Sequence, residues 1–150
     1  MVVNVTIKTE GSLDRPVSRL RVFGERALDP GVALIQAADE IADANIARIE
    51  SGKGLKKLAA VTIRKKTKLG QPTKPLQATK HLLASLKPGA PDNILKVYRT
   101  VMRYGTSDFH AHLQTNRPNV PKRRVISVAK PMKLKVAAIL DDYLTEPFRG

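Results

Sequence analysis

The sequence predicts an α+β domain in which a small, mostly antiparallel sheet packs against a long N-terminal helix, a middle helix and a C-terminal helix. Two observations support this prediction. Three stretches repeat apolar residues at three- and four-residue steps, which predicts helices, and other short stretches alternate apolar with polar residues or are rich in β-branched residues, which predicts strands. A chain of 150 residues with 42% hydrophobic content fits one modest core. We therefore expect a single domain over residues 1–150.

The N-terminal part is expected to contain a strand, an irregular stretch and a long helix. Residues 2–8 alternate in the period-two pattern of a half-buried strand. Pro16 and Gly24 interrupt the next segment, so any helix between Pro16 and Phe23 should be short. Asp29 followed by Pro30 is typical of a helix start, because Asp caps free amides and Pro is tolerated in the first turn. The apolar spacing then predicts a helix that runs to about Glu50.

A basic segment follows at about residues 51–75. Eight basic residues and no acidic one lie between Lys53 and Lys74, and Gly70 and Pro72 break any regular pattern. We expect a flexible cationic loop there, with at most a turn of helix near Thr62 to Lys68.

The remaining elements are a helix, two strands and a final helix. Leucines at helical spacing predict a helix from Pro75 to Leu86, which Pro88 and Gly89 end. Residues 94–104 and 124–128 are expected to be strands. The last helix should extend from about Pro131 to Leu144.

Charge is distributed very unevenly along the chain. Residues 1–50 hold 6 basic and 8 acidic side chains, whereas residues 51–140 hold 20 basic and 2 acidic ones. Such a segment attracts polyanions and acidic protein surfaces, although it could also serve only as a solubilising surface. The sequence does not separate DNA from an acidic protein as the partner. The candidate interface residues are Lys56, Lys57, Arg64, Lys65, Lys66, Lys68, Arg117, Lys122, Arg123 and Arg124.

Signatures of enzymes, metal sites and membrane proteins are missing from the sequence. The chain has no cysteine, and residues 51–140 offer only Asp92 and Asp108 as carboxylates. His110 and His112 form an H-x-H pair that falls short of the usual number of metal ligands. There is no apolar run of membrane-spanning length and no signal peptide. We expect a soluble protein without enzymatic activity, cofactor or metal, which is not exported from the compartment where it is made.

Several motifs in the second half of the chain resemble the phage virion morphogenesis, or tail completion, family, which includes Mu-like and P2-like proteins. The first is the pattern Pro75-Leu76-x-x-Thr79-x-x-Leu82-x-x-Ser85-Leu86. In that family a glycine commonly follows the threonine, whereas this chain has Lys80, so the helix is expected to continue there. Further matches are Tyr104-Gly105-Thr106, then Phe109, His112 and Gln114, then Arg123 as the recurring arginine, and a closing helix at residues 138–144.

The resemblance, which covers about residues 28–144, implies a structural protein of a tailed-phage virion. Such proteins assemble as a ring, expected here to be a hexamer, which completes the tail or neck and joins it to the head. The implied partners are further copies of the chain, tail tube proteins, head connector proteins and, without sequence specificity, genomic DNA. Assembly would take place in the host cytoplasm. The alternative is a small basic nucleic-acid-binding protein, and the sequence does not decide between a tail terminator and a neck position.

Overall fold

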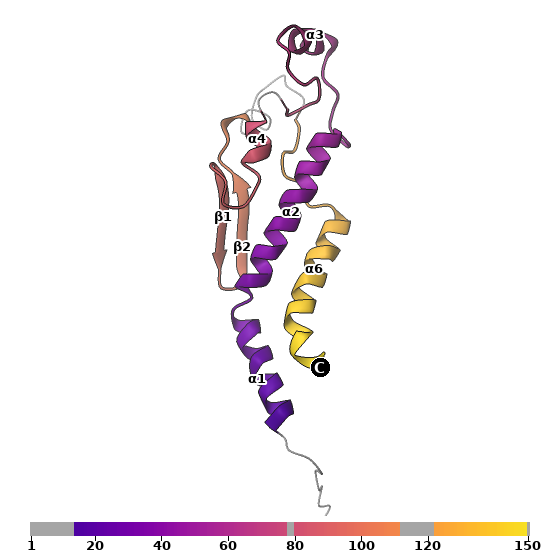
Figure 1. Cartoon of the computed structure of the whole chain (residues 1–150). Helices are drawn as coiled ribbons and strands as arrows, with labels where there is room; N and C mark the ends of the chain where they lie inside the picture. Colours follow the sequence, from indigo (N-terminus) through magenta and orange to yellow (C-terminus); the bar gives the residue numbers. More distant parts are fainter. Residues whose placement is uncertain (1–13, 78–79, 112–121, 150) are drawn as a thin grey trace, which may run out of the picture.

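The computed structural model describes residues 14–77, 80–111 and 122–149 (Figure 1). The strand expected at residues 2–8 lies outside the described residues. The elements, in chain order, are α1 (Asp14–Leu28), α2 (Gly31–Ser51), α3 (Ala60–Lys68), α4 (His81–Ala84), β1 (Asn93–Tyr98), β2 (Val101–Thr106), α6 (Lys130–Thr145) and a short 3-10 helix, η1 (Glu146–Phe148). The fold class is α+β, as predicted.

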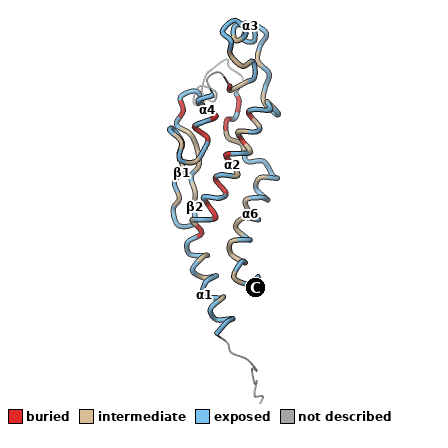
Figure 2. The backbone as a smooth tube through the Cα atoms, viewed as in Figure 1, coloured by how far each residue is buried: buried red, intermediate tan, exposed pale blue. Residues whose placement is uncertain are grey.

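Helix α2 is the centre of the fold, with the β1–β2 hairpin on one side and α6 on the other (Figure 1). Figure 2 shows that buried residues follow α2, and four of its eight buried residues are alanines. Because alanine is small, neighbouring elements can approach the helix closely. The predicted start is confirmed, since the Gly31 amide donates to Asp29 Oδ1 at 3.2 Å. The final helix also lies where the sequence predicts it, now as α6.

The single strand predicted at residues 94–104 is wrong, because this stretch is an antiparallel hairpin. Tyr98 pairs with Val101 across a two-residue turn in which Arg99 has φ 30°. The reversal places Leu95 opposite Tyr104 and Val97 opposite Met102, so that these four side chains share the less exposed face. The turn contains no glycine or asparagine, the residues that usually mark a two-residue hairpin turn, so the sequence pattern of the stretch looks like one continuous strand.

The helix predicted from Pro75 to Leu86 is also wrong, because α4 is the only helical segment among the described residues of this stretch. Leu76 has φ 62° and Lys80 has φ 58°, a left-handed conformation that a continuous right-handed helix cannot contain. The expectation that the helix continues through Lys80 fails for the same reason. After α4, Asn93 Nδ2 donates to the Leu86 carbonyl at 3.3 Å, and the Tyr104 hydroxyl donates to the same oxygen. The hairpin thus supplies hydrogen bonds to the end of this short helical turn.

Residues 124–128 were predicted as a strand and do not form one. The Ser127 amide donates to Asn45 Oδ1 at 2.8 Å, and the Arg48 guanidinium donates to the carbonyls of Arg124 and Val125 at 2.8 and 2.7 Å. Backbone groups of an irregular segment need such partners when they are shielded from water. Two polar side chains of α2, Asn45 and Arg48, thus provide the hydrogen bonds that a neighbouring strand would otherwise make.

The helices α1 and α3 lie at opposite ends of an elongated chain (Figure 1). Helix α1 is longer than predicted, and Arg26 fastens it to the C-terminal end by donating to the Tyr143 carbonyl at 2.6 Å and pairing with Glu146 at 2.6 Å. The rings of Phe23 and Phe148 add an edge-to-face contact at 5.8 Å. Neither α1 nor α3 has a buried residue (Figure 2).

Candidate functional site

The basic segment contains a helix, α3, that projects at one end of the chain (Figure 1). The sequence predicts at most a turn here, and the structure has nine helical residues. Arg64, Lys65 and Lys68 are exposed on α3. The other exposed members of the predicted interface are Lys56, Lys57, Lys122 and Arg124.

Two residues of the predicted interface point inward instead. Arg123 is 7% exposed, and its guanidinium donates to the carbonyls of Lys56 and Lys57 at 2.9 and 3.2 Å. Lys66 Nζ donates to the carbonyls of Pro72 and Lys74 at 2.8 and 3.1 Å. Burial, together with the nearby charge of Arg123, lowers the pKa of Lys66. The assignment of Arg123 to the surface is therefore corrected: it holds backbone segments together.

The C-terminal end of the basic segment is fixed to the C-terminus of α2. Lys74 Nζ donates to the Glu50 carbonyl and Gln77 Nε2 to the Ile49 carbonyl, each at 2.6 Å. The last carbonyls of a helix lack partners in the next turn, so Lys74 satisfies the Glu50 carbonyl, while Gln77 adds a second donor to the Ile49 carbonyl, which also accepts from the Gly52 amide. Helix α3 consequently projects from an anchored base.

Most of the family-motif positions that the structure describes are buried or half-buried and contribute to the core. Leu82 and Ser85 are buried at 3% and 1% exposure, whereas Phe109 is exposed. Pro75 and Leu76 are half-buried, and Leu76 packs against the core that contains Leu82. Outside the described residues lie Thr79, His112, Gln114 and Arg117.

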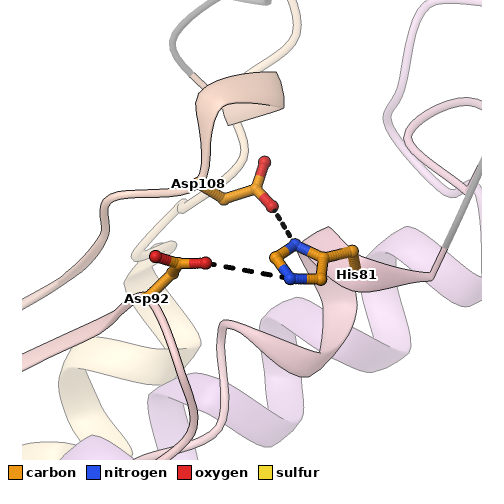
Figure 3. Close-up of side chains that lie close together, drawn as sticks. All are labelled: His81, Asp92 and Asp108. Carbon is orange, nitrogen blue, oxygen red and sulfur yellow. Dashed lines mark hydrogen bonds and ion pairs between the residues drawn. The ribbon is translucent and has the colours of Figure 1, made fainter.

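A separate cluster joins His81, Asp92 and Asp108 (Figure 3). His81 begins α4, Asp92 immediately precedes β1, and Asp108 lies two residues after β2. His81 Nδ1 is 2.6 Å from Asp108 Oδ2, and His81 Nε2 is 3.8 Å from Asp92 Oδ2. Both carboxylates of residues 51–140 therefore lie beside one histidine.

Asp108 is the buried member of this cluster, at 4% exposure. The backbone amide of His110 donates to its Oδ1 at 2.7 Å, and His110 Nδ1 lies 3.1 Å from the same oxygen. Burial alone would raise the pKa of Asp108, but hydrogen bonds from His81 and His110 outweigh burial and lower it. The hydrogen bond to Asp108, opposed by desolvation and aided by both negative charges, raises the pKa of His81. Asp108 is thus a fixed anion that orients two histidines.

This arrangement does not fit nucleophilic catalysis. Both ring nitrogens of His81 face carboxylates, so neither faces a hydroxyl to be deprotonated. The hydroxyl of Ser107 donates to the Asp92 carbonyl at 3.2 Å, and no described Ser or Thr hydroxyl hydrogen-bonds to His81. A cation or a proton can bind between the histidine and Asp92.

Sequence reasoning missed this cluster because its three residues come from separate segments of the chain, 11 and 16 positions apart. One signal was available: Asp92 and Asp108 are the only carboxylates of residues 51–140. Two isolated anions in a strongly cationic segment are good candidates for a shared partner, which here is His81.

Comparisons of the chain with protein families, curated proteins and solved structures find no match. Over the described ranges, no helix is both long and apolar enough to cross a membrane.

Proposed function

We propose that this chain is a structural protein of a tailed-phage virion, a ring subunit that completes the tail or neck so that head and tail can join. The observation that carries the proposal is the exposed apolar face of α1, at the end of the chain opposite the cationic α3. A ring subunit needs two different surfaces for its neighbours and a third for the structure above or below it.

The apolar face of α1 supports self-assembly. Val17, Leu20 and Leu28 are 60%, 61% and 68% exposed. They recur at helical spacing on a helix without a buried residue. Burying apolar surface is favourable by about 25 cal/mol per Å², so covering this face on a neighbouring subunit would stabilise an assembly.

The cationic helix α3 supports contact with an anionic partner. Arg64, Lys65 and Lys68 are exposed on this helix. The segment after it is already hydrogen-bonded to α2, so binding a partner does not have to order that segment first. Phosphate contacts need charge and reach, and they do not by themselves specify a base sequence. An acidic tail or connector protein and DNA in the channel both fit this surface.

The backbone at Lys80 supports the family resemblance on which the proposal also rests. In the tail completion family a glycine commonly occupies this position, and glycine adopts positive φ without strain. Lys80 has φ 58°, so this chain retains the backbone conformation that such a glycine would favour. The neighbouring motif residues Leu82 and Ser85 are buried, as shared structural positions would be.

The test is electron microscopy of lysates from the phage or prophage that carries the gene, after the gene is interrupted and supplied again from a plasmid. We expect separate filled heads and tails, or tails of abnormal length, without the gene, and whole virions with the plasmid. Normal virions without the gene would refute the proposal.

A Leu20→Asp plasmid tests the role of α1 in the same assay. We expect it to restore few virions, whereas Val101→Asp, which introduces the same charge at an exposed hairpin residue, should restore them. Equal restoration by both variants would show that the α1 face is not an assembly surface.

The second candidate, a free-standing nucleic-acid-binding protein, is favoured by the exposed cations of α3. It predicts DNA binding that survives moderate salt, whereas loose phosphate contacts weaken steeply as salt increases. Normal virions in the interruption experiment, together with salt-resistant DNA binding, would make this the better reading.

A further inference from the structure

The geometry around His81 points to a zinc site: we propose that His81 Nε2 and Asp92 Oδ2 bind one Zn²⁺ ion, while Asp108 holds the imidazole from its other side (Figure 3). The inference does not depend on the proposed virion role. Three features of the cluster favour an ion there: the orientation of His81, the position of Asp92 and the charge of the three side chains.

Asp108 fixes the ring of His81. An ionised carboxylate only accepts hydrogen bonds, so the 2.6 Å contact places a proton on His81 Nδ1. In neutral His81 the lone pair is then on Nε2, the nitrogen that faces Asp92. Metal-binding histidines almost always donate their other ring N–H to a carboxylate, a backbone carbonyl or water. Because Asp108 is buried and held by His110, this orientation exists before any ion binds.

Asp92 is held at a distance that suits an ion better than a direct hydrogen bond. Ser107 fixes this residue from the side, since its amide donates to the Asp92 carbonyl at 2.8 Å and its hydroxyl lies 3.3 Å from Asp92 Oδ1. Asp92 Oδ2 remains 3.8 Å from His81 Nε2. Nitrogen and oxygen atoms in a hydrogen bond are about 2.7–3.2 Å apart, whereas two ligands of a tetrahedral zinc ion, each about 2 Å from it, are about 3.3 Å apart. The Asp92 carboxylate therefore has to approach His81 by roughly 0.5 Å when the ion binds.

The charge and donor types favour zinc over other common cations. With His81 neutral, the state that binds a metal, the two aspartates give the cluster two negative charges, which a divalent ion would neutralise. The raised pKa of His81 makes a proton the competitor of the ion. A mixed nitrogen and carboxylate set suits zinc, while magnesium and calcium prefer oxygen ligands alone. Two protein ligands are fewer than zinc sites usually have, so water has to supply the rest of the coordination, and the 55% and 43% exposure of the His81 and Asp92 side chains leaves room for it. The ion would tie α4 to the residue that precedes β1 and would stabilise the folded chain by mass action.

Isothermal titration of the full chain with zinc chloride, after removal of metals with a chelator, tests the proposal. We expect saturation at one equivalent, with binding at least tenfold weaker in His81→Asn and in Asp92→Asn. The amide of His81→Asn can still donate to Asp108 but lacks the atom equivalent to Nε2. Asp92→Asn keeps an oxygen near Ser107 and removes the charge.

Asp141→Asn is the matched control. It makes the same substitution as Asp92→Asn at an exposed position on α6, outside the His81 cluster. It should change zinc affinity less than twofold. Absence of saturable binding, wild-type affinity in Asp92→Asn, or an equal loss in Asp141→Asn would each overturn the proposal. Circular dichroism checks that the variants are folded. If His81→Asn is unfolded, the zinc affinity of Asp92→Asn alone tests the proposal.

Discussion

Two groups of basic side chains in this molecule behave in opposite ways although the sequence does not distinguish them. Arg48, Lys66, Lys74 and Arg123 donate hydrogen bonds to backbone carbonyls. By contrast, the α3 side chains of Arg64, Lys65 and Lys68 are exposed, as are Lys122 and Arg124 in the segment before α6. Part of the charge of residues 51–140 therefore holds the chain together and only the rest is presented to a partner.

The reason lies in where the chain lacks regular secondary structure. The carbonyls that accept from these four cations belong to residues 56–57, 72–74 and 124–125, which are neither helix nor strand, and to the last turn of α2. Such carbonyls have no ladder partner and need donors from elsewhere. Long basic side chains reach them from several residues away, and their stems cover apolar surface.

Arg123→Ala should produce the largest effect on stability. It removes donors to two carbonyls at a residue that is 7% exposed, so we expect a loss of roughly 2–3 kcal/mol in the free energy of unfolding. Urea unfolding measures this loss, with Arg124→Ala as the control because its side chain is exposed. Equal stability of the two variants would mean that the inward group does not support the fold.

Tyr104→Phe extends the comparison to a neutral inward donor, whose hydroxyl donates to the Leu86 carbonyl. Its removal should cost about 1 kcal/mol in the free energy of unfolding, the net value of a typical hydrogen bond. Burial, with smaller contributions from Asp43 and Asp39, raises the pKa of Tyr104 to about 12.

The sign of the pH effect follows from the raised pKa. The unfolded tyrosine ionises near pH 10, so the contribution of Tyr104 is complete below about pH 10 and is lost as the pH rises toward 12. Ultraviolet titration of the folded protein should show a phenol that ionises near pH 12 and is missing from Tyr104→Phe. Ionisation of this phenol near pH 10 would contradict its burial.

The elements that the sequence predicts correctly are those whose pattern is local and long. The helix from Asp29 and the helix that starts near Pro131 each repeat apolar residues over several turns, and both are present as α2 and α6. Helix α1 is longer than expected because Pro16 lies in its first turn, where proline is tolerated.

The elements that the sequence misses depend on partners that no local pattern contains. Residues 124–128 resemble a strand, but side chains of Asn45 and Arg48 provide their hydrogen bonds. The leucine spacing after Pro75 suggests a helix, which the positive φ of Leu76 and Lys80 interrupts. In the candidate site, the exposed charges of α3 are predictable from composition, whereas the His81 cluster requires knowledge of which loops meet.

Lys74→Ala should have a smaller effect than Tyr104→Phe. Lys74 is exposed and donates to the Glu50 carbonyl at the C-terminus of α2, so we expect a loss of about 0.5 kcal/mol in the free energy of unfolding. Lys68→Ala removes the same type of charge from α3 without that contact and serves as the control. If Lys68→Ala is the more destabilising of the two, the anchored base does not depend on Lys74.

The smallest effect on stability should come from the combined variant Arg64→Gln, Lys65→Gln and Lys68→Gln. These side chains are exposed, and glutamine is nearly as good a helix former as arginine or lysine, so the free energy of unfolding should change by less than about 0.5 kcal/mol. The matched control, Lys87→Gln with Lys96→Gln and Arg103→Gln, removes three exposed cations elsewhere and gives the same net charge.

The same pair of variants separates a local contact from the overall charge. If α3 contacts phosphates, its variant should lower the slope of log affinity for DNA against log salt by up to about 2.7, since each lost phosphate contact contributes about 0.9. The control should leave that slope nearly unchanged. Equal slopes in the two variants would mean that DNA responds to the total charge of the chain, and α3 would then remain available for an acidic protein partner. Only a difference between the variants assigns the outward group of cations to DNA.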